Sequence, residues 1–567
     1  MAKLTVLPME ETIELKDSET VREALQRMGI EIETPCDGQG VCGQCAIQVE
    51  DPEGVPETPH KNITREQAAE GVRLACRVCP RSDLTVRLSA ELFEETLILE
   101  GADFSDSPVG ARRVFRGRIA PAARVSRRDD ATWMRYDGGS EWVRLEDWEK
   151  GFAPKGLAID LGTTTLVVSL LSLWTGEELA TASALNPQVW YGHDVMTRIQ
   201  RGSTEEGRAE LVEAVREGLN RLIEEVCSNS ESNAQEVLDV VIGGNTTMLQ
   251  LAADIDPAPL GRVPFAVDIR GSKAYPAKRF GLHVNPEARV YVPPISHAFI
   301  GSDISAGLVV CEGFFSSEAS MLFIDVGTNG EMALSRGNRW IITSTAAGPA
   351  FEGMGISSGR RAVVGAVQAA ITNGKSVEFS TVGDAPPKGI CGSGIIDLIA
   401  VLLTLKVLDP TGRMKHPGEK NGLPAAVASL LEDLEGKAAF RLGENVYFTQ
   451  EDVRQVQLAK GAIRTAIDML LGQDGSAALD KVVIAGAFGH ALRPGSLEGI
   501  GMIPPGMAEK VSFAGNTSRL GCTRLLLDVF ERRSIEKRMT KVEHLALVEH
   551  PEYMDRYIES MNFPSGI

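Results

Sequence analysis

The chain has 567 residues, too many for one hydrophobic core, and its length predicts several domains. Its 43% hydrophobic and 24% charged residues are ordinary for a globular protein and exclude wholesale disorder. The net charge of −19 argues against nucleic acid or an anionic membrane as the main partner. The N-terminus has acidic residues where a signal peptide would be apolar, and the longest apolar stretch, from Gly394, is too short to cross a bilayer, so we expect a cytoplasmic protein.

The first expected domain, residues 1–95, carries a loop rich in thiols and glycines, "PCDGQGVCGQCAIQV". Cys36, Cys42 and Cys45 have the spacing C-x5-C-x2-C, and Cys76 follows after a gap of thirty residues. Four thiolates are the ligand set of an iron–sulfur cluster, and the loop glycines permit a backbone that wraps closely around inorganic sulfide. Around the loop, "KLTVLP" and "TIELK" predict a hairpin, "TVREALQRMG" a short helix, and "CAIQVE" a strand.

These features resemble the plant- and adrenodoxin-type [2Fe–2S] ferredoxin domain, with a first gap closer to the adrenodoxin spacing. The rival metal is zinc, because Cys42/Cys45 and Cys76/Cys79 form two C-x2-C pairs. Zinc leaves Cys36 and the loop glycines unexplained, whereas the cluster leaves only Cys79 spare. We therefore favour the cluster.

Residues 96–154 form an expected linker or small middle region without clear periodicity. Eight arginines fall between Arg112 and Arg135, in an otherwise acidic chain. Two interpretations stay open: a docking patch for an acidic partner, or a linker or small domain that covers part of the next one.

The last expected domain, residues 155–567, contains two copies of one pattern, a buried strand that ends in D-x-G-T and is followed by a second strand. The first copy begins at Asp160 and the second at Asp325, about 165 residues later, which suggests a duplicated domain whose two turns face one another. Glycine lets backbone amides approach phosphate oxygens, threonine hydroxyls donate to them, and the aspartates can hold Mg²⁺ through its waters. The candidate phosphate-binding residues are Gly162, Thr163 and Thr164 in the first turn and Gly327, Thr328 and Asn329 in the second.

A third glycine motif, "KVVIAGAFGHAL", brings Gly486, Ala487 and Gly489 to the end of a buried strand. Together the three motifs resemble the phosphate 1, phosphate 2 and adenosine motifs of the superfamily of acetate and sugar kinases, Hsp70 and actin, which implies two lobes closing on ATP and Mg²⁺, with Asp160 and Asp325 as catalytic carboxylates. No G-x-x-x-x-G-K-[ST] is present, which excludes a P-loop.

Two further segments of this domain are candidate nucleotide contacts. Gly392 and Ser393 in "GICGSG" precede a helical run, and this segment is either a nucleotide-binding helix start or a structural turn. Asn245 in "GGNTTM" lies at a strand end, where it faces the nucleotide or caps the next helix.

The whole arrangement, with "DLGTTT", "GGNTTM", "DVGTNGE", "GPAFEG", "QLAKGAI" and "AGAFG" in this order, resembles the reductive activators of corrinoid proteins. That resemblance implies ATP-dependent return of Co(II) to Co(I) in a corrinoid partner, with an electron from the [2Fe–2S] cluster and an unidentified low-potential electron donor upstream. The alternatives are a small-molecule kinase and an ATP-driven clamp, each with an accessory iron–sulfur domain. Base rates favour a homodimer.

Overall fold

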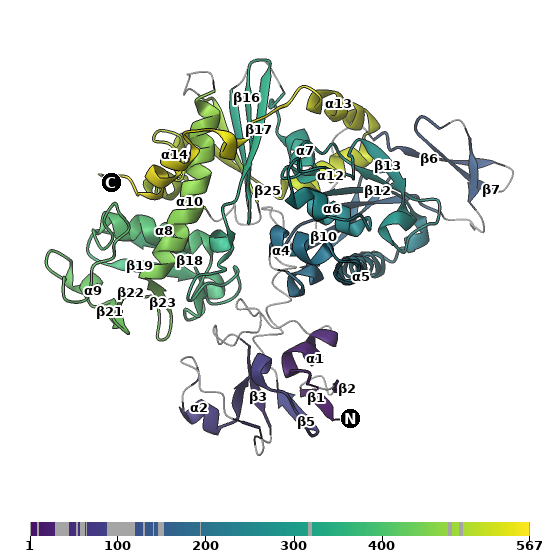
Figure 1. The fold of residues 1–567 in the computed structure, drawn as a ribbon. Coiled ribbons are helices and arrows are strands. Elements are labelled where there is room, and N and C mark those ends of the chain that lie inside the picture. The colour runs from purple at the N-terminus through teal and green to yellow at the C-terminus, as the bar shows by residue number, and fades with distance from the viewer. Residues whose placement is uncertain are drawn as a thin grey trace. The chain divides into compact units, whose positions relative to one another are not determined.

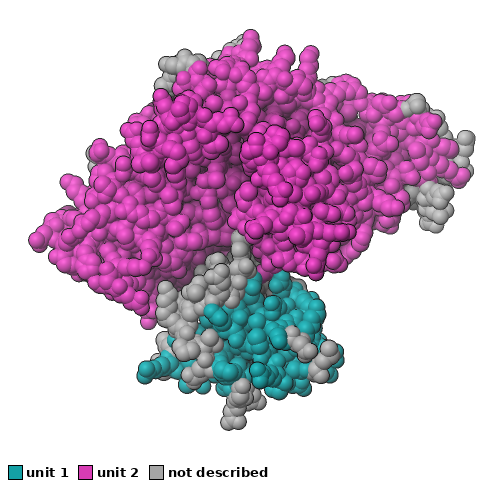
Figure 2. Space-filling model, viewed as in Figure 1, with its two compact units in different colours: residues 1–102 teal, residues 103–567 magenta. Residues whose placement is uncertain are grey.

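The computed structural model describes residues 2–565 apart from 8–10, 17, 29–44, 51, 53–54, 57–62, 64, 88–118, 129–130, 140, 146–151, 193, 316–319, 474–478 and 487–491. The chain divides into two compact units, residues 1–102 and residues 103–567, which Figure 2 colours separately. Each unit is described by itself.

Unit 1 is a five-stranded mixed sheet with a short helix. Strand β1 pairs antiparallel with β2 and parallel with β5, in the order β2-β1-β5-β3-β4. The helix α1 starts at a capping box, in which Thr20 and Glu23 each satisfy a backbone amide of the other. The predicted hairpin, short helix and exit strand are all confirmed. The elements of unit 1 are β1 (Lys3–Leu7), β2 (Glu11–Glu14), α1 (Val21–Arg27), β3 (Ala46–Val49), α2 (Arg65–Ala69), β4 (Val72–Leu74), η1 (Ala75–Arg77) and β5 (Leu84–Arg87).

Unit 2 contains two six-stranded sheets, and five strands of each share one topology (Figure 1). In each, three antiparallel strands are followed by two strands parallel to the first, in the orders β11-β10-β9-β12-β14 and β17-β16-β15-β24-β25. The duplication predicted from the two D-x-G-T patterns is therefore confirmed. The strands of the first sheet are β9 (Lys155–Leu161), β10 (Thr165–Ser172), β11 (Glu178–Leu185), β12 (Val237–Gly244), β13 (Lys273–Pro276) and β14 (Arg289–Val292). Those of the second are β15 (Met321–Val326), β16 (Gly330–Arg336), β17 (Arg339–Thr345), β24 (Lys481–Ala485), β25 (Val511–Gly515) and β26 (Glu543–His544).

The first sheet with its covering helices is called the first lobe here, and the second sheet with its covering elements the second lobe. The helices of the first lobe are α4 (Val195–Gly202), α5 (Glu205–Asn229), α6 (Thr246–Ala252) and α7 (Ser302–Val310). The helices of the second lobe are α8 (Gly392–Thr404), α9 (Ala425–Ala428), α10 (Gln450–Leu471), α11 (Pro494–Gly499) and α14 (Tyr553–Met561). This lobe also has two small sheets. One is formed by β18 (Ala366–Thr372), β19 (Val377–Thr381) and β20 (Gly389–Ile390), and the other by β21 (Leu431–Leu434), β22 (Lys437–Arg441) and β23 (Tyr447–Thr449). Among the described residues, no helix is long and apolar enough to span a bilayer.

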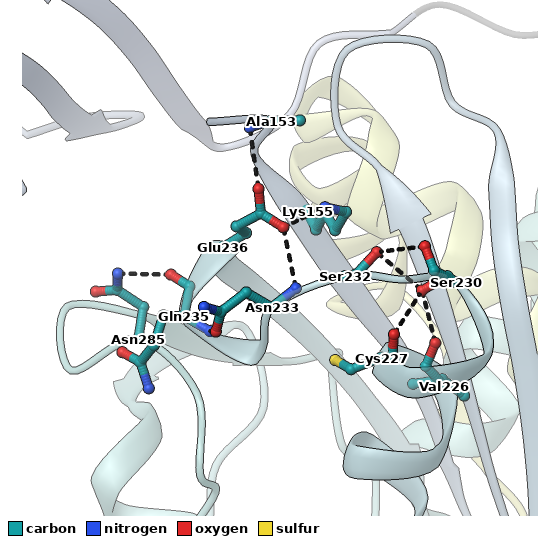
Figure 3. A network of polar contacts seen from close by, with 10 residues as sticks. All are labelled: Ala153, Lys155, Val226, Cys227, Ser230, Ser232, Asn233, Gln235, Glu236 and Asn285. Atoms are coloured by element: carbon teal, nitrogen blue, oxygen red, sulfur yellow. Dashed lines mark hydrogen bonds and ion pairs between the residues drawn. The ribbon is translucent and has the colours of Figure 1, made fainter. Parts of the chain in front are cut away.

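The start of strand β9 is fixed by one carboxylate, as Figure 3 shows. Glu236 accepts hydrogen bonds from the backbone amides of Ala153 (3.3 Å) and Asn233 (3.1 Å), and it forms an ion pair with the ammonium of Lys155. Lys155 is the first residue of β9, and Glu236 immediately precedes the parallel neighbour β12. This network therefore sets where β9 begins, and with it the position of Asp160 near its end.

Two helices late in the sequence return to the first lobe (Figure 1). Helix α12 (Thr517–Leu527) packs against α7, β9 and β12, and α13 (Val529–Met539) follows it. The guanidinium of Arg532 forms an ion pair at 2.7 Å with Asp239 of β12, and both side chains are buried. Residues far apart in the sequence thus reach the end of β9.

Part of the arginine-rich segment packs onto the same lobe. Strands β6 (Ala123–Arg128), β7 (Ala131–Tyr136) and β8 (Val143–Leu145) form a small antiparallel sheet. Met134 and Leu145 belong to the apolar cluster that includes Ala158 of β9. The Tyr136 hydroxyl donates to the carbonyl of Leu238 and accepts from the amide of Arg289. This sheet is therefore built onto the first lobe.

The segment "QLAKGAI" in α10 holds the end of the chain. Gln457 donates to the carbonyl of Met561 at 3.0 Å, and the buried ammonium of Lys460 donates to the carbonyl of Asn562. A side chain in place of Gly461 would lie 3.0 Å from Met561. The motif is thus explained by the packing of α14 on α10.

Candidate functional site

The two D-x-G-T turns are called the phosphate hairpins here, after the role that the sequence predicts for them. The first phosphate hairpin connects β9 to β10 in the first lobe. The amide of Gly162 donates to the carbonyl of Thr165 at 3.0 Å, and a Cβ at position 162 would lie 2.6 Å from that oxygen, so only glycine fits. Asn186 holds the turn from outside: its side-chain amide donates to the carbonyl of Gly162, and its backbone amide to that of Thr164, both at 2.8 Å. Asn245 caps α6 and donates to the Thr163 hydroxyl at 2.7 Å.

The second phosphate hairpin connects β15 to β16 in the second lobe. The amide of Gly327 donates to the carbonyl of Asn329 at 2.9 Å, which closes the turn. The amide of Gly348 donates to the carbonyl of Thr328 at 2.9 Å. The D-x-G-T pattern thus forms a tight turn in each lobe, although the glycine amide donates to the residue three positions on in the first turn and two positions on in the second.

The two hairpins meet at one carboxylate. Glu352, at the end of the short helix η6 (Pro349–Glu352), accepts from the hydroxyl of Thr328 at 2.6 Å and from that of Thr164 at 3.2 Å. The first threonine belongs to the second lobe and the other to the first. The structure therefore brings together the two turns that the sequence predicts to face one another.

Four carboxyl groups lie close enough at this junction to affect one another's ionisation. Burial and the charges of Asp303 and Asp160 raise the pKa of Asp325 to about 7. Burial and the charge of Asp160 raise the pKa of Asp303 to about 7, against hydrogen bonds from backbone amides. Burial and the charges of Asp303 and Asp325 raise the pKa of Glu331 well above its usual value. Crowded acidic groups of this kind are neutralised by protons or by a cation.

Magnesium would fit this cluster only through its water shell. Within the described ranges, no three Asp, Glu, His or Cys side chains are placed to ligate one metal ion directly. Mg²⁺ in nucleotide sites usually keeps several waters and takes few protein ligands. The carboxylates could therefore orient those waters, which is the role the sequence predicts for Asp160 and Asp325.

Asp160 differs from the other three in having two side-chain donors. The Asn516 amide donates to Oδ2 and the Ser518 hydroxyl to Oδ1, both at 2.7 Å. Both donors come from the start of α12. Burial raises the pKa of Asp160, and these two hydrogen bonds act against that rise.

Of the three residues predicted from the third glycine motif, only Gly486 lies within the described residues. Gly486 follows β24 with φ +113°, and a Cβ there would lie 2.5 Å from the carbonyl of Val326 and 3.5 Å from Asp325 Oδ1. It therefore lies directly against the second hairpin. Ala487 and Gly489 lie outside the described residues.

Gly392 and Ser393 begin α8 and are buried. The Ser393 hydroxyl donates to the carbonyl of Gln368 at 2.8 Å, and a Cβ at position 392 would lie 1.9 Å from the carbonyl of Phe351. These contacts place the start of α8 against η6, one residue from Glu352. A role in contacting nucleotide stays a prediction.

Five further residues of this junction were not predicted from the sequence. Asp303 looks like an ordinary acidic residue in the first turn of a helix, and Asn516 and Ser518 look like helix-capping residues. Glu331 and Glu352 lie within the motifs "DVGTNGE" and "GPAFEG", and the sequence pattern indicates no role for either side chain. An acidic side chain beside buried strands is the signal that could have found these two, because such groups are rarely buried without a partner.

In unit 1 two of the predicted cluster ligands are described. Cys45 and Cys76 are buried, neither is in a disulfide, and their sulfur atoms lie 3.2 Å apart. Cys79 is exposed and its thiol lies 3.8 Å from the carbonyl of Ser18. Both the cluster and the zinc ligand sets include Cys45 and Cys76, so Cys79 is the residue that separates them, and its exposed thiol beside Ser18 favours the cluster set. Cys36 and Cys42 lie outside the described residues.

Three family models match successive parts of this chain. The model of a 2Fe-2S iron-sulfur cluster binding domain matches residues 4–81, that of the RACo middle region residues 155–313, and that of the C-terminal domain of RACo, the ASKHA domain, residues 319–566. The corrinoid activation enzyme RamQ of Eubacterium limosum is 27% identical over 99% of this chain and 98% of its own length. The [Co(II) methylated amine-specific corrinoid protein] reductase of Methanosarcina barkeri is 26% identical over 72% of this chain and 77% of its own.

A solved structure, the reductive activator for corrinoid,iron-sulfur protein, covers 100% of this chain and 98% of its own with 28% identity and a TM-score of 0.69. The fold and the paired hairpins define an ATPase of the ASKHA class joined to a 2Fe-2S domain. The chain carries the middle and C-terminal ASKHA domains of RACo behind a 2Fe-2S domain, and it is similar over its whole length to reductive activators of corrinoid proteins, as its sequence predicts.

Proposed function

We propose that this protein uses ATP hydrolysis to drive a one-electron reduction of Co(II) to Co(I) in a corrinoid protein, which restores the cobalt nucleophile for methyl transfer. The observation that carries the proposal is the pairing of the two phosphate hairpins through Thr164, Thr328 and Glu352 in a chain that also contains a 2Fe-2S domain. The relatives are named for their action on corrinoid proteins, which supports a corrinoid protein as the substrate.

In the ATPase unit, each hairpin would offer backbone amides and a threonine hydroxyl to the phosphates. Asp160, oriented by Asn516 and Ser518, and Asp325 would hold the hydrated Mg²⁺, and Asp325 would orient the attacking water. Gly486 would let the backbone beside the second hairpin approach the nucleotide closely. Asn245 would steady Thr163.

In unit 1, Cys36, Cys42, Cys45 and Cys76 would hold a [2Fe–2S] cluster, which supplies one electron at a time when bound. An external low-potential donor would reduce the protein. We expect a cytoplasmic homodimer with no nucleic-acid or membrane partner, and each of these is open to direct test.

The deciding experiment is a single-turnover reduction with pre-reduced full-length protein and a Co(II) corrinoid protein, followed by the cobalt absorption spectrum, with and without MgATP. Co(I) should form only with MgATP. Cys76→Ser should abolish the reaction and the iron content, whereas the matched variant Cys79→Ser should keep both. Equal Co(I) formation with and without MgATP would contradict the proposal. ATP turnover that needs a small acceptor would favour a kinase, and stoichiometric zinc without labile sulfide would contradict the cluster.

A further inference from the structure

The carboxylate of Glu352 holds one hydrogen-bond donor from each phosphate hairpin. Thr328 donates to its Oε1 at 2.6 Å and Thr164 donates to its Oε2 at 3.2 Å. Each oxygen of the carboxylate is therefore used by a different lobe. Glu352 is an anion located where the donors of the two hairpins converge.

These two hydroxyls cannot serve two anions at once. A threonine hydroxyl carries one hydrogen and donates one strong hydrogen bond at a time. In this structure the hydrogens of Thr164 and Thr328 are both committed to Glu352. A phosphate can therefore accept hydrogen bonds from these two hydroxyls only when their hydrogen bonds to Glu352 are broken.

Charge also makes Glu352 and a phosphate competitors. Burial raises the pKa of Glu352, and the hydrogen bonds from Thr328 and Thr164 oppose this rise, with help from the positive charge of Arg361. Loss of the two hydroxyls would remove the two largest of the interactions that favour the ionised carboxylate, and would leave the charge of Arg361 and the backbone amide of Thr328. A phosphate would add negative charge at the same place, so the two anions repel one another.

Two glycines and one buried aromatic residue shape the short helix η6, which carries Glu352. Gly348 and Gly353 flank η6 and have φ values of +79° and +83°, in the region that favours glycine. Phe351 is 1% exposed and anchors the turn in the core of the second lobe. Glycine thus permits the sharp backbone turns at both ends of η6, and Phe351 anchors the segment between them.

We propose that Glu352 is a positioning residue that occupies the place of an ATP phosphate between the two hairpins, and that MgATP binds by taking Thr164 and Thr328 from it. The inference rests on the proposed function and specifies what the residues of the site do as phosphate enters. Release of the phosphate returns both hydroxyls to Glu352. The carboxylate therefore links the lobes whenever no phosphate does.

The test is calorimetric titration of full-length protein with MgATP and with AMP. Removal of the competitor in Glu352→Ala should lower the Kd for MgATP by about tenfold or more, because hydrogen bonds to a charged group each contribute about that factor. Glu352→Gln should have a smaller effect, since its amide oxygen still accepts one hydrogen bond. AMP lacks the β- and γ-phosphates, and its affinity should not change. In steady-state hydrolysis the KM for ATP should fall without a rise in kcat.

Ser357→Ala is the matched control. The Ser357 hydroxyl contacts Asp452 at 3.0 Å in the segment that follows η6, away from the threonines, so its loss should leave MgATP affinity unchanged. Thermal unfolding of each variant verifies folding, and Glu352→Gln serves if the alanine variant does not fold. Unchanged or weaker MgATP binding by the Glu352 variants would overturn the inference. Failure of the wild-type protein to bind MgATP would overturn the proposed function, and the inference with it.

Discussion

The two phosphate hairpins share the D-x-G-T pattern, but their aspartates have different surroundings. Asp160 accepts two hydrogen bonds from the start of α12. For Asp325, no side-chain donor is found among the residues that the structure describes, and burial with the charges of Asp303 and Asp160 raises its pKa to about 7. Two hydrogen bonds thus oppose the rise of the Asp160 pKa, whereas neighbouring charges add to the rise of the Asp325 pKa.

This difference separates two roles that the sequence pattern alone makes equal. Hydrogen bonds to a carboxylate favour its charged form and fix its orientation. A crowded carboxylate without such bonds gains most from a nearby Mg²⁺. We therefore expect Asp160 to be oriented before nucleotide binds, and Asp325 to be fully ionised near pH 7 only when the metal is bound.

The largest expected effects come from Asp160→Asn and Asp325→Asn. Each should lower kcat for ATP hydrolysis by about 10²–10³ or more, since each removes charge stabilisation at the phosphates. Their effects on stability should differ. Asp160→Asn should lower the free energy of unfolding by about 1–3 kcal/mol, because an amide cannot accept from both donors. Asp325→Asn should leave stability at pH 8 unchanged or raised, because it removes a destabilised charge.

These two effects are measured by phosphate release and by urea unfolding at pH 8. Equal loss of stability in both variants would contradict the distinction between the hairpins. Hydrolysis at the wild-type rate in Asp325→Asn would contradict the site itself.

Loss of one donor to Asp160 should have an intermediate effect. Asn516→Ala and Ser518→Ala should each lower kcat by about tenfold, which corresponds to one hydrogen bond to a charged group. Because the hydrogen bonds oppose the rise of the Asp160 pKa, the acidic limb of the pH–rate profile should move to higher pH. Ser512→Ala, at a weak 3.4 Å contact on β25, should change neither. Identical pH profiles in all variants would show that these donors do not act through Asp160.

Gly486→Ala tests the contact between the third glycine motif and the second hairpin. The added methyl group would meet the carbonyl of Val326, and φ at this position is +113°. Strain of this kind costs about 1–3 kcal/mol, and displacement of the hairpin should weaken MgATP binding. Gly495→Ala, where a Cβ meets no atom within 4 Å, is the control. Unchanged stability and affinity in Gly486→Ala would contradict the close contact.

The smallest expected effect is a pH-dependent response to Mg²⁺. Carboxyl groups have a pKa of about 4 when unfolded, and those of Asp303 and Asp325 are raised to about 7 in the fold. Between these values the folded state keeps protons that the unfolded state has released, so stability should fall as pH rises from about 4 to about 7 and then level off. Mg²⁺ should therefore raise Tm more at pH 8 than at pH 6. An equal rise at both pH values would contradict the raised pKa values.

The parts of this site that follow from local sequence could be predicted. A buried strand, an aspartate and a glycine turn lie next to one another in the chain, so the sequence pattern predicts both hairpins and the duplication of the domain. The partners of Asp160 were not, because Asn516 lies 356 residues away and reaches it only when α12 returns to the first lobe. Asp303 and Glu352 come from a helix start and a turn whose neighbours are set by the pairing of the lobes. In the first unit, the sequence predicts Cys45 and Cys76 as ligands of one cluster, and their sulfurs lie 3.2 Å apart.

The most direct test of the account joins the two activities in one variant. Full-length Asp325→Asn is reduced beforehand, mixed with MgATP and a Co(II) corrinoid protein, and followed through a single turnover beside the wild-type protein. The variant should take up its electron normally and form no Co(I), while the wild-type protein reduces the cobalt. Formation of Co(I) by the variant to the wild-type extent would contradict the claim that hydrolysis between the two hairpins drives the reduction.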